Sequence, residues 1–173
     1  MAGREQTLNE EIANAITHGL GILFSLIAIP VMIWYAFETS TVPTVWAVSI
    51  FGFGMLMVYL SSTLYHAVQH KGTKKLLQIW DHISIFLLIA GSYTPLVVKY
   101  TDAGTSKVFL TVLWGLVALG SFLKLFYTGR FKVVSVLLYL GMGWMAVFII
   151  KPLLAHMPLN IFYLILASGL AYT

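Results

Sequence analysis

Long apolar runs separated by short polar connectors dominate the pattern of this chain. The runs cover residues 19–37, 44–66, 79–98, 108–127, 132–150 and 159–173. Most of them have about the 20 residues that a helix needs to cross roughly 30 Å of hydrocarbon. They are continuously apolar rather than alternating, and only helices or closed barrels satisfy their backbone groups in lipid. The pattern therefore predicts an all-α, polytopic transmembrane helical bundle with about six spans.

The connectors carry residues that are typical of turns and membrane interfaces. They cover 38–43, 69–75, 101–104 and 128–130. Because all of them are short, successive helices are expected to be antiparallel neighbours, within a single transmembrane domain that covers 1–173.

A polar segment before the first run predicts a helix start. Thr7-Leu-Asn-Glu10 fits a capping box, in which the Thr7 hydroxyl caps the Glu10 amide and the Glu10 carboxylate reaches back to Thr7. We expect a short interfacial helix over about 8–18 that leads into the first span.

Composition excludes a soluble globular domain. The chain is 60% hydrophobic and 9% charged, whereas a soluble domain is roughly 45–50% apolar and about 25% charged. A soluble protein of this size cannot bury so much apolar surface. The sequence has no cysteine, so disulfides and thiolate metal sites are excluded as well.

The basic residues indicate an orientation rather than a nucleic-acid partner, because they are scattered between the apolar runs. One set of flanks holds seven of them: Arg4, Lys71, Lys74, Lys75, Lys124, Arg130 and Lys132. The opposite flanks hold three: Lys99, Lys107 and Lys151. Lys and Arg are enriched in cytoplasmic loops, so the excess predicts a cytosolic N-terminus.

Costly polar side chains gather near the ends of two spans. Ser62 and His66 are an i, i+4 pair on one face of the second span, near its cytosolic end. Asp81 opens the third span after a cytosolic hairpin. Because the two spans are antiparallel, His66 and Asp81 are expected at similar depth. Ionisable groups inside spans are expensive and indicate function by default.

The first span adds to this cluster, since Glu11, Asn14 and His18 recur at helical spacing on its cytosolic side. A cluster of His, Asp, Glu, Asn and Ser suits metal-assisted hydrolysis. Neutral imidazoles bind Zn²⁺, and a carboxylate orients a ligand or takes the proton from bound water. On this interpretation His66 is a metal ligand, while Asp81 and Ser62 are catalytic candidates.

Simpler interpretations stay open for the histidines. His66 and His18 have the character of membrane-interface anchors, and His18 can also cap the first span. The other histidines are expected to be interfacial: His70, His82 and His156.

The acidic residues also have simpler interpretations. Asp81 can pair with Lys74 or Lys75, or it can cap the third helix, because Asp favours the first turn of a helix. Glu11 can be a solvated neighbour of the capping box.

Three motifs together resemble the bacterial haemolysin III branch of the progestin and adipoQ receptor family. They are Glu11-x-x-Asn-x-x-Thr-His18-Gly, Ser62-x-x-x-His66, and the stretch from Trp80-Asp-His to Gly91-Ser-Tyr-Thr-Pro95. The resemblance covers the whole chain.

The resemblance implies seven spans, a cytosolic N-terminus and a zinc ion held by three histidines near the cytosolic side. His66 matches the first zinc ligand, and Asp81 matches an aspartate that contacts a zinc-bound water. The family's other two ligands come from a His-x-x-x-His on a seventh span.

The sequence departs from the family pattern at the zinc ligands, because it contains no His-x-x-x-His. The last apolar run is also short for a bilayer. We therefore expect the chain to be truncated before the seventh span, and to bind zinc weakly or not at all, whereas the full-length protein binds it.

By resemblance, the expected function is a zinc-dependent hydrolase of membrane lipid amides or esters, similar to ceramidases. The alternative is a non-enzymatic sensor or regulator of membrane state with structural zinc, and a pore-forming haemolysin ranks below both. Membrane lipids are the expected partners, and the bacterial inner (plasma) membrane is the expected location.

Overall fold

The structure is a computed structural model that describes residues 6–127 and 132–172, and its regular elements are helices. They are α1 (Leu8–Thr39), α2 (Val42–Ala67), α3 (Lys71–Tyr100), α4 (Ala103–Tyr127), α5 (Lys132–Gly143), the 3-10 helix η1 (Trp144–Ile149), α6 (Ile150–His156) and α7 (Leu159–Tyr172). The connector expected at 128–130 lies outside the described residues.

The prediction of a transmembrane helical bundle is confirmed. Five helical segments of the described chain are long and apolar enough to cross a membrane: α1, α2, α3, α4 and the joined segment Val133–His156. The sixth apolar run forms α7, which has 14 residues. Large apolar side chains cover the outside of the bundle, as a lipid environment requires.

The capping box predicted at the first helix is confirmed. Glu10 N–H donates to the Thr7 hydroxyl at 3.4 Å, and Thr7 N–H donates to the Glu10 carboxylate at 2.7 Å. The helix that begins at Leu8 then continues without a break to Thr39. The segment 8–18, expected as a short interfacial helix that leads into the first span, is continuous with that span in α1.

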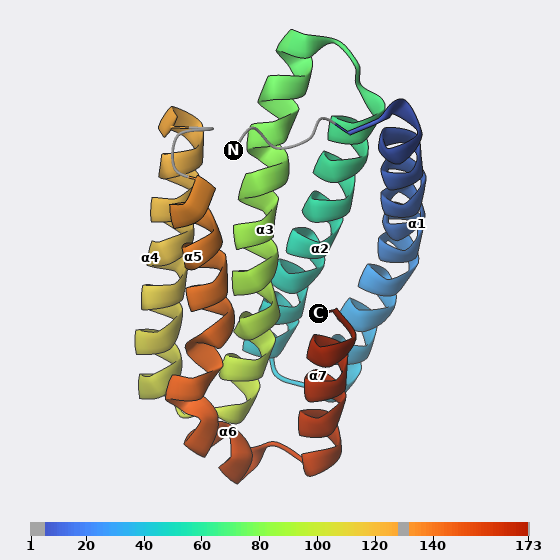
Figure 1. Cartoon of the computed structure of the whole chain (residues 1–173). Coiled ribbons are helices and arrows are strands. Elements are labelled where there is room, and N and C mark those ends of the chain that lie inside the picture. Colours follow the sequence, from blue (N-terminus) through green and yellow to red (C-terminus); the bar gives the residue numbers. More distant parts are fainter. Residues whose placement is uncertain (1–5, 128–131, 173) are drawn as a thin grey trace.

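Helices α1, α2 and α3 form one side of the bundle, with α2 between the other two, and α4 and α5 lie beyond α3 (Figure 1). Helix α3 packs against α2, α4, α5 and α6. The start of α1, the end of α2 and the start of α3 meet at the same end of the bundle (Figure 1). That end carries the polar residues singled out above.

Small residues allow α2 and α3 to approach closely. A Cβ atom on Gly54 would lie 2.9 Å from the Leu87 carbonyl oxygen, and one on Gly91 would lie 3.2 Å from the Cα of Phe51. The Ser61 and Ser84 hydroxyls hydrogen-bond between the two helices at 2.9 Å. Such small-residue contacts and interhelical hydroxyl bonds hold helices together in lipid, where the hydrophobic effect does not.

The fifth span is not one continuous α-helix. Its α-helix ends at Gly143, and η1 follows before α6 resumes. Tyr93 of α3 compensates for the break, since its hydroxyl donates to the Gly143 carbonyl and accepts the Ala146 N–H at 3.0 Å. Backbone groups in hydrocarbon need such partners, so one side chain stabilises the change from α-helix to 3-10 helix.

Candidate functional site

The candidate site lies where α1, α2 and α3 meet at one end of the bundle. Glu11 is on the opening turns of α1, Ser62 and His66 are on the last turns of α2, and Asp81 is on α3. The i, i+4 spacing of Ser62 and His66 places both on the buried face of α2, where they are 3% and 9% exposed.

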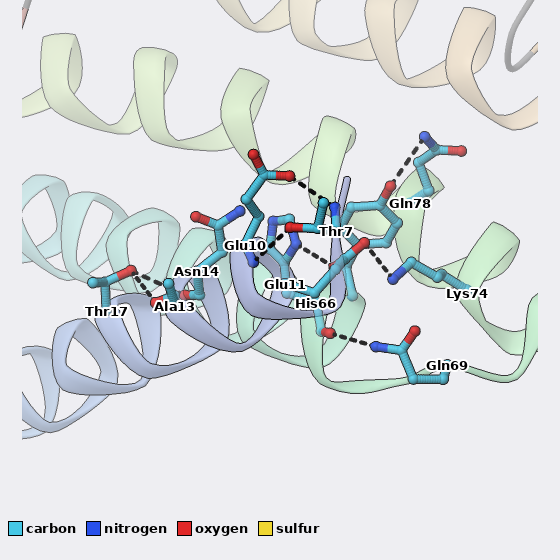
Figure 2. A network of polar contacts seen from close by, with 11 residues as sticks. Thr7, Glu10, Glu11, Ala13, Asn14, Thr17, His66, Gln69, Lys74 and Gln78 are labelled. Carbon is cyan, nitrogen blue, oxygen red and sulfur yellow. Dashed lines mark hydrogen bonds and ion pairs between the residues drawn. The ribbon is translucent and has the colours of Figure 1, made fainter. Parts of the chain in front are cut away.

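Glu11 connects all three helices through its two carboxylate oxygens. Oε2 lies 2.8 Å from Nδ1 of His66, and Oε1 accepts a hydrogen bond from Nζ of Lys74 at 2.7 Å. Figure 2 shows both contacts, with Glu11 between the other two side chains. Glu11 is only 7% exposed, so this carboxylate has exchanged water for one donor on each oxygen.

The His66 ring is held on several sides. The Tyr65 ring lies 4.8 Å away and the His18 ring 6.1 Å away, both edge to face. Because Glu11 occupies Nδ1, the ring nitrogen left for a further ligand is Nε2.

Asp81 faces the same cluster from α3 and is partly buried. It interacts with the Ser62 hydroxyl and lies close enough to His66 and His18 for electrostatic interaction. The structure thus brings together the residues that the sequence places at one depth: Glu11, His18, Ser62, His66 and Asp81.

His18 and Asn14 take different positions in this cluster. Nδ1 of His18 is buried and has no hydrogen-bond partner among the described residues, and its ring also contacts Tyr59 at 6.1 Å. The backbone carbonyl of Asn14 accepts a hydrogen bond from the Thr17 hydroxyl at 3.1 Å. Among the described residues, no hydrogen bond joins the Asn14 side chain to the cluster.

The simpler interpretations of Asp81 and Glu11 are wrong. Lys74 pairs with Glu11 and not with Asp81, because the first turns of α3 face α1. Asp81 does not cap α3 either, since the helix starts at Lys71 and the His70 side chain accepts the Thr73 N–H. Glu11 is buried in an ion pair rather than solvated.

Sequence reasoning missed the aromatic residues around the cluster. Tyr65 contacts His66, accepts a hydrogen bond from Gln78 at 3.4 Å and lies under Lys74. Tyr139 of α5 is near enough to Asp81 to interact electrostatically and donates to the His82 carbonyl at 2.9 Å. Tyrosines are common in apolar runs and do not by themselves indicate a site. The position of Tyr65 directly before His66 was the one feature of the sequence that could have indicated it.

The donor set fits one zinc ligand but not a complete site within the described residues. His66 has the arrangement of a metal-binding imidazole, with one nitrogen supported by a carboxylate and the other available. A catalytic zinc site uses about three protein ligands, and the described chain brings no three His, Cys, Asp or Glu side chains into metal-binding range.

A shallow groove of about 380 Å³ opens beside His66. Its wall is apolar and comes mainly from α1, and its polar edge comes from the end of α2. The lining residues are Leu8, Ile12, Ala15, Ile16, His66, Ala67 and Gln69. The groove has an apolar wall and one polar end, which matches the apolar chain and polar group of a lipid.

Comparison with known proteins gives one consistent result. A family model described as "Haemolysin-III related" matches residues 6–173. The chain is 40% identical over 167 residues to "Hemolysin-3 homolog" of Bacillus subtilis (strain 168), covering 96% of this chain and 78% of that protein.

Two further relatives extend the comparison. "Hemolysin-3" of Bacillus cereus is 39% identical over 173 residues, covering 100% of this chain and 79% of that protein. "Monocyte to macrophage differentiation factor" of Homo sapiens is 24% identical over 143 residues, covering 80% and 59%. No solved structure matches the chain.

Proposed function

This chain belongs to the haemolysin III-related family, and from that premise we propose that it is a zinc-dependent hydrolase of membrane lipid amides or esters. The observation that carries the proposal is the buried cluster at the joint end of α1, α2 and α3. Buried ionisable groups in an apolar bundle are costly and are retained where they do chemistry.

Each residue of the cluster receives a role from its surroundings. His66 offers Nε2 to the metal because Nδ1 is already bound to Glu11. Asp81 is the acceptor for a proton from the attacking water, and Ser62 holds the Asp81 carboxylate in place. Zinc, when bound, supplies Lewis acidity that activates water and polarises a carbonyl group.

The position of the cluster supports a lipid substrate. It lies at one end of the spans, where the amide or ester group of a membrane lipid is found, rather than at the centre of the bundle (Figure 1). The groove beside His66 gives an acyl chain an apolar wall that leads to the polar end. A water-soluble substrate has no apolar chain to place against this wall.

The apolar core of the bundle argues against a pore, which is the activity that the names of the relatives suggest. A channel needs a polar lining along its whole length. The buried core around α3 and α4 is apolar in the described chain, with Phe86, Val97, Leu113 and Val117 at its centre. Conductance in liposomes of the purified protein, abolished by a point substitution, would reverse this argument.

The test is lipid hydrolysis by the purified full-length protein in liposomes. Fatty-acid release from a lipid amide is expected to require zinc and to fall about 10²–10⁴-fold in Asp81→Asn, which removes the proton acceptor. His66→Ala is expected to lose both zinc and activity. His156→Ala, at an exposed histidine of α6, is the matched control and should behave as the wild type.

Two outcomes would remove the proposal. Turnover that survives both His66→Ala and Asp81→Ala places the chemistry elsewhere. Restoration of membrane fluidity in a deletion strain by the inactive Asp81→Asn protein favours the regulator of membrane state.

A further inference from the structure

Glu11 contacts His66 and Lys74 contacts Glu11, and neither Glu11 nor Lys74 touches substrate or metal in the proposed reaction. We infer that Glu11 and Lys74 act together as a tautomer lock, which fixes the proton of the neutral His66 ring on Nδ1 and leaves Nε2 free to bind a ligand. Glu11 is thereby a positioning residue. The inference rests on the proposed function only where it concerns zinc, because the tautomer itself is a property of the metal-free protein.

Among the described residues, each carboxylate oxygen of Glu11 has a single donor. Oε1 of Glu11 lies 2.7 Å from Nζ of Lys74, and Oε2 lies 2.8 Å from Nδ1 of His66. The ammonium group of lysine has only donors, and an ionised carboxylate has only acceptors. The contact between Glu11 and His66 therefore requires a proton on Nδ1.

Lys74 supplies the positive charge that balances Glu11, so the pair does not need a charged imidazole as well. In a neutral ring one nitrogen donates and the other accepts. With Nδ1 as the donor, Nε2 is the acceptor, and an unprotonated imidazole nitrogen is what a metal ion binds.

The lock spans three helices and is shielded from water. Glu11 and His66 are 7% and 9% exposed, and the side chain of Lys74 is 21% exposed. Water is therefore a poor substitute for either donor. The Tyr65 ring contacts both His66 and Lys74, at 4.8 Å and 5.1 Å, which limits other arrangements of the two side chains.

Glu11→Gln is the decisive substitution, because it keeps the shape of the side chain and replaces one acceptor oxygen with an NH₂ donor group. The Gln amide has one acceptor oxygen and one NH₂ donor group. Lys74 can only donate, so it takes the amide oxygen and turns the NH₂ group towards Nδ1 of His66. Nδ1 must then accept, and the proton moves to Nε2.

Removing Lys74 as well should reverse the effect. In Glu11→Gln/Lys74→Met the amide oxygen has lost its obligatory donor and is free to accept from Nδ1–H. The second substitution thus restores the original tautomer, although it removes one more native contact. A merely structural role for Glu11 predicts the opposite, namely that two losses are worse than one.

The measurement is nitrogen NMR of histidine-labelled, chelator-treated protein in detergent, at a pH where the ring is neutral. His66→Gln assigns the His66 signals. The expected result is Nδ1–H in the wild type, Nε2–H in Glu11→Gln and Nδ1–H again in the double variant. Glu10→Gln is the matched control, since Glu10 reaches Thr7 rather than His66, and it should keep Nδ1–H.

Zinc affinity gives a second readout in the full-length protein. Glu11→Gln should weaken zinc binding about 10–100-fold, the usual cost of losing a carboxylate partner of a ligand histidine, and the double variant should recover part of it. Absence of zinc binding by the wild type would count against the proposed function alone.

The inference is overturned by an Nε2–H tautomer of His66 in the wild type, once the comparison with His66→Gln has assigned its signals. It is equally overturned if the tautomer is unchanged in folded Glu11→Gln, or if the double variant keeps Nε2–H.

Discussion

Tyr93 uses a single hydroxyl group for two backbone partners on another span. It donates to the Gly143 carbonyl and accepts the Ala146 N–H, on either side of the junction between α5 and η1. Its ring also packs against Phe109 in the buried core. One residue therefore gives hydrogen-bond partners to the backbone on both sides of the break.

Tyr93→Phe should destabilise the bundle without changing its shape. The substitution takes this hydroxyl partner from the Gly143 carbonyl and the Ala146 N–H, which lie inside an apolar span. A backbone group left without a partner away from water costs about 1–3 kcal/mol. Tyr35→Phe, on the exposed surface of α1, is the control with the same chemical change. Unfolding in mixed detergent micelles measures both, and equal stability of the two variants would contradict the role given to the hydroxyl.

Asp102 stabilises the start of α4 in a manner that depends on pH. The Thr105 hydroxyl and N–H, together with the Gly104 N–H, donate to its carboxylate and hold the pKa of Asp102 below the ordinary value of 3.8. A carboxyl with a lowered folded-state pKa stabilises the fold above its unfolded-state pKa and loses that contribution as pH falls through the folded value.

The stability of the wild type over Asp102→Ala should therefore be present at neutral pH and fade below pH 3.8. The effect is small because the side chain is fully exposed. Asp102→Asn keeps an acceptor oxygen but does not titrate, so its stability relative to the wild type should change in the same acidic range. A difference between wild type and Asp102→Ala that is independent of pH would contradict this account.

At the scale of the helix pair, the contact between α2 and α3 depends on the absence of side chains. Gly54→Ala puts a methyl group 2.9 Å from the Leu87 carbonyl oxygen, and overpacking of this kind costs about 1–3 kcal/mol. Gly115→Ala is the matched control, because nothing lies within 4 Å of its Cβ position on α4.

The two glycine variants should move stability in opposite directions. Gly115→Ala should gain about 0.5–1 kcal/mol through helix propensity alone, whereas Gly54→Ala should lose stability. Both changes are read from unfolding in mixed micelles. Equal gains for the two would mean that the helices can separate at no cost.

Sequence patterns predict helix starts well where capping chemistry marks them and poorly where it does not. Thr7 and Glu10 predict the start of α1 at the correct residue. Hydrophobicity places the start of the third run at 79, but α3 begins at Lys71. The pattern misses this start because the first turns of α3 are polar and extend beyond the apolar segment. Hydropathy identifies the part of a helix that lies in lipid, not the whole helix.

The break in the fifth span was not predictable. Glycines such as Gly143 occur in many intact membrane helices, and the compensating hydroxyl comes from Tyr93, far away in the sequence. The polar cluster was predictable in location because the hairpin between α2 and α3 fixes the depth of His66 and Asp81. The partner of Lys74 was not, since the choice between Glu11 and Asp81 depends on how α1 packs.

The orientation of the whole molecule in the membrane stays a prediction from its charges. The sequence has no cysteine, so single cysteines can report on each side without background. Gln69→Cys lies before α3 and Ala103→Cys follows it, so the two positions should face opposite sides of the membrane.

With the N-terminus in the cytosol, an impermeant maleimide should label Ala103→Cys in intact cells and Gln69→Cys only after lysis. The reverse pattern would place the N-terminus outside, against the excess of Lys and Arg. Labelling of both in intact cells would contradict a single crossing by α3.

The salt bridge between Glu11 and Lys74 has a consequence for biogenesis. A ribosome releases α1 and α2 before α3, so the insertion machinery receives Glu11 before its counter-ion exists. Burying a carboxylate without a partner costs free energy. In the early intermediate the start of α1 is therefore expected to stay in water. The start of α1 then packs into the bundle only after α3 has been inserted. Nascent chains that stall after α2 should therefore be degraded by quality-control proteases.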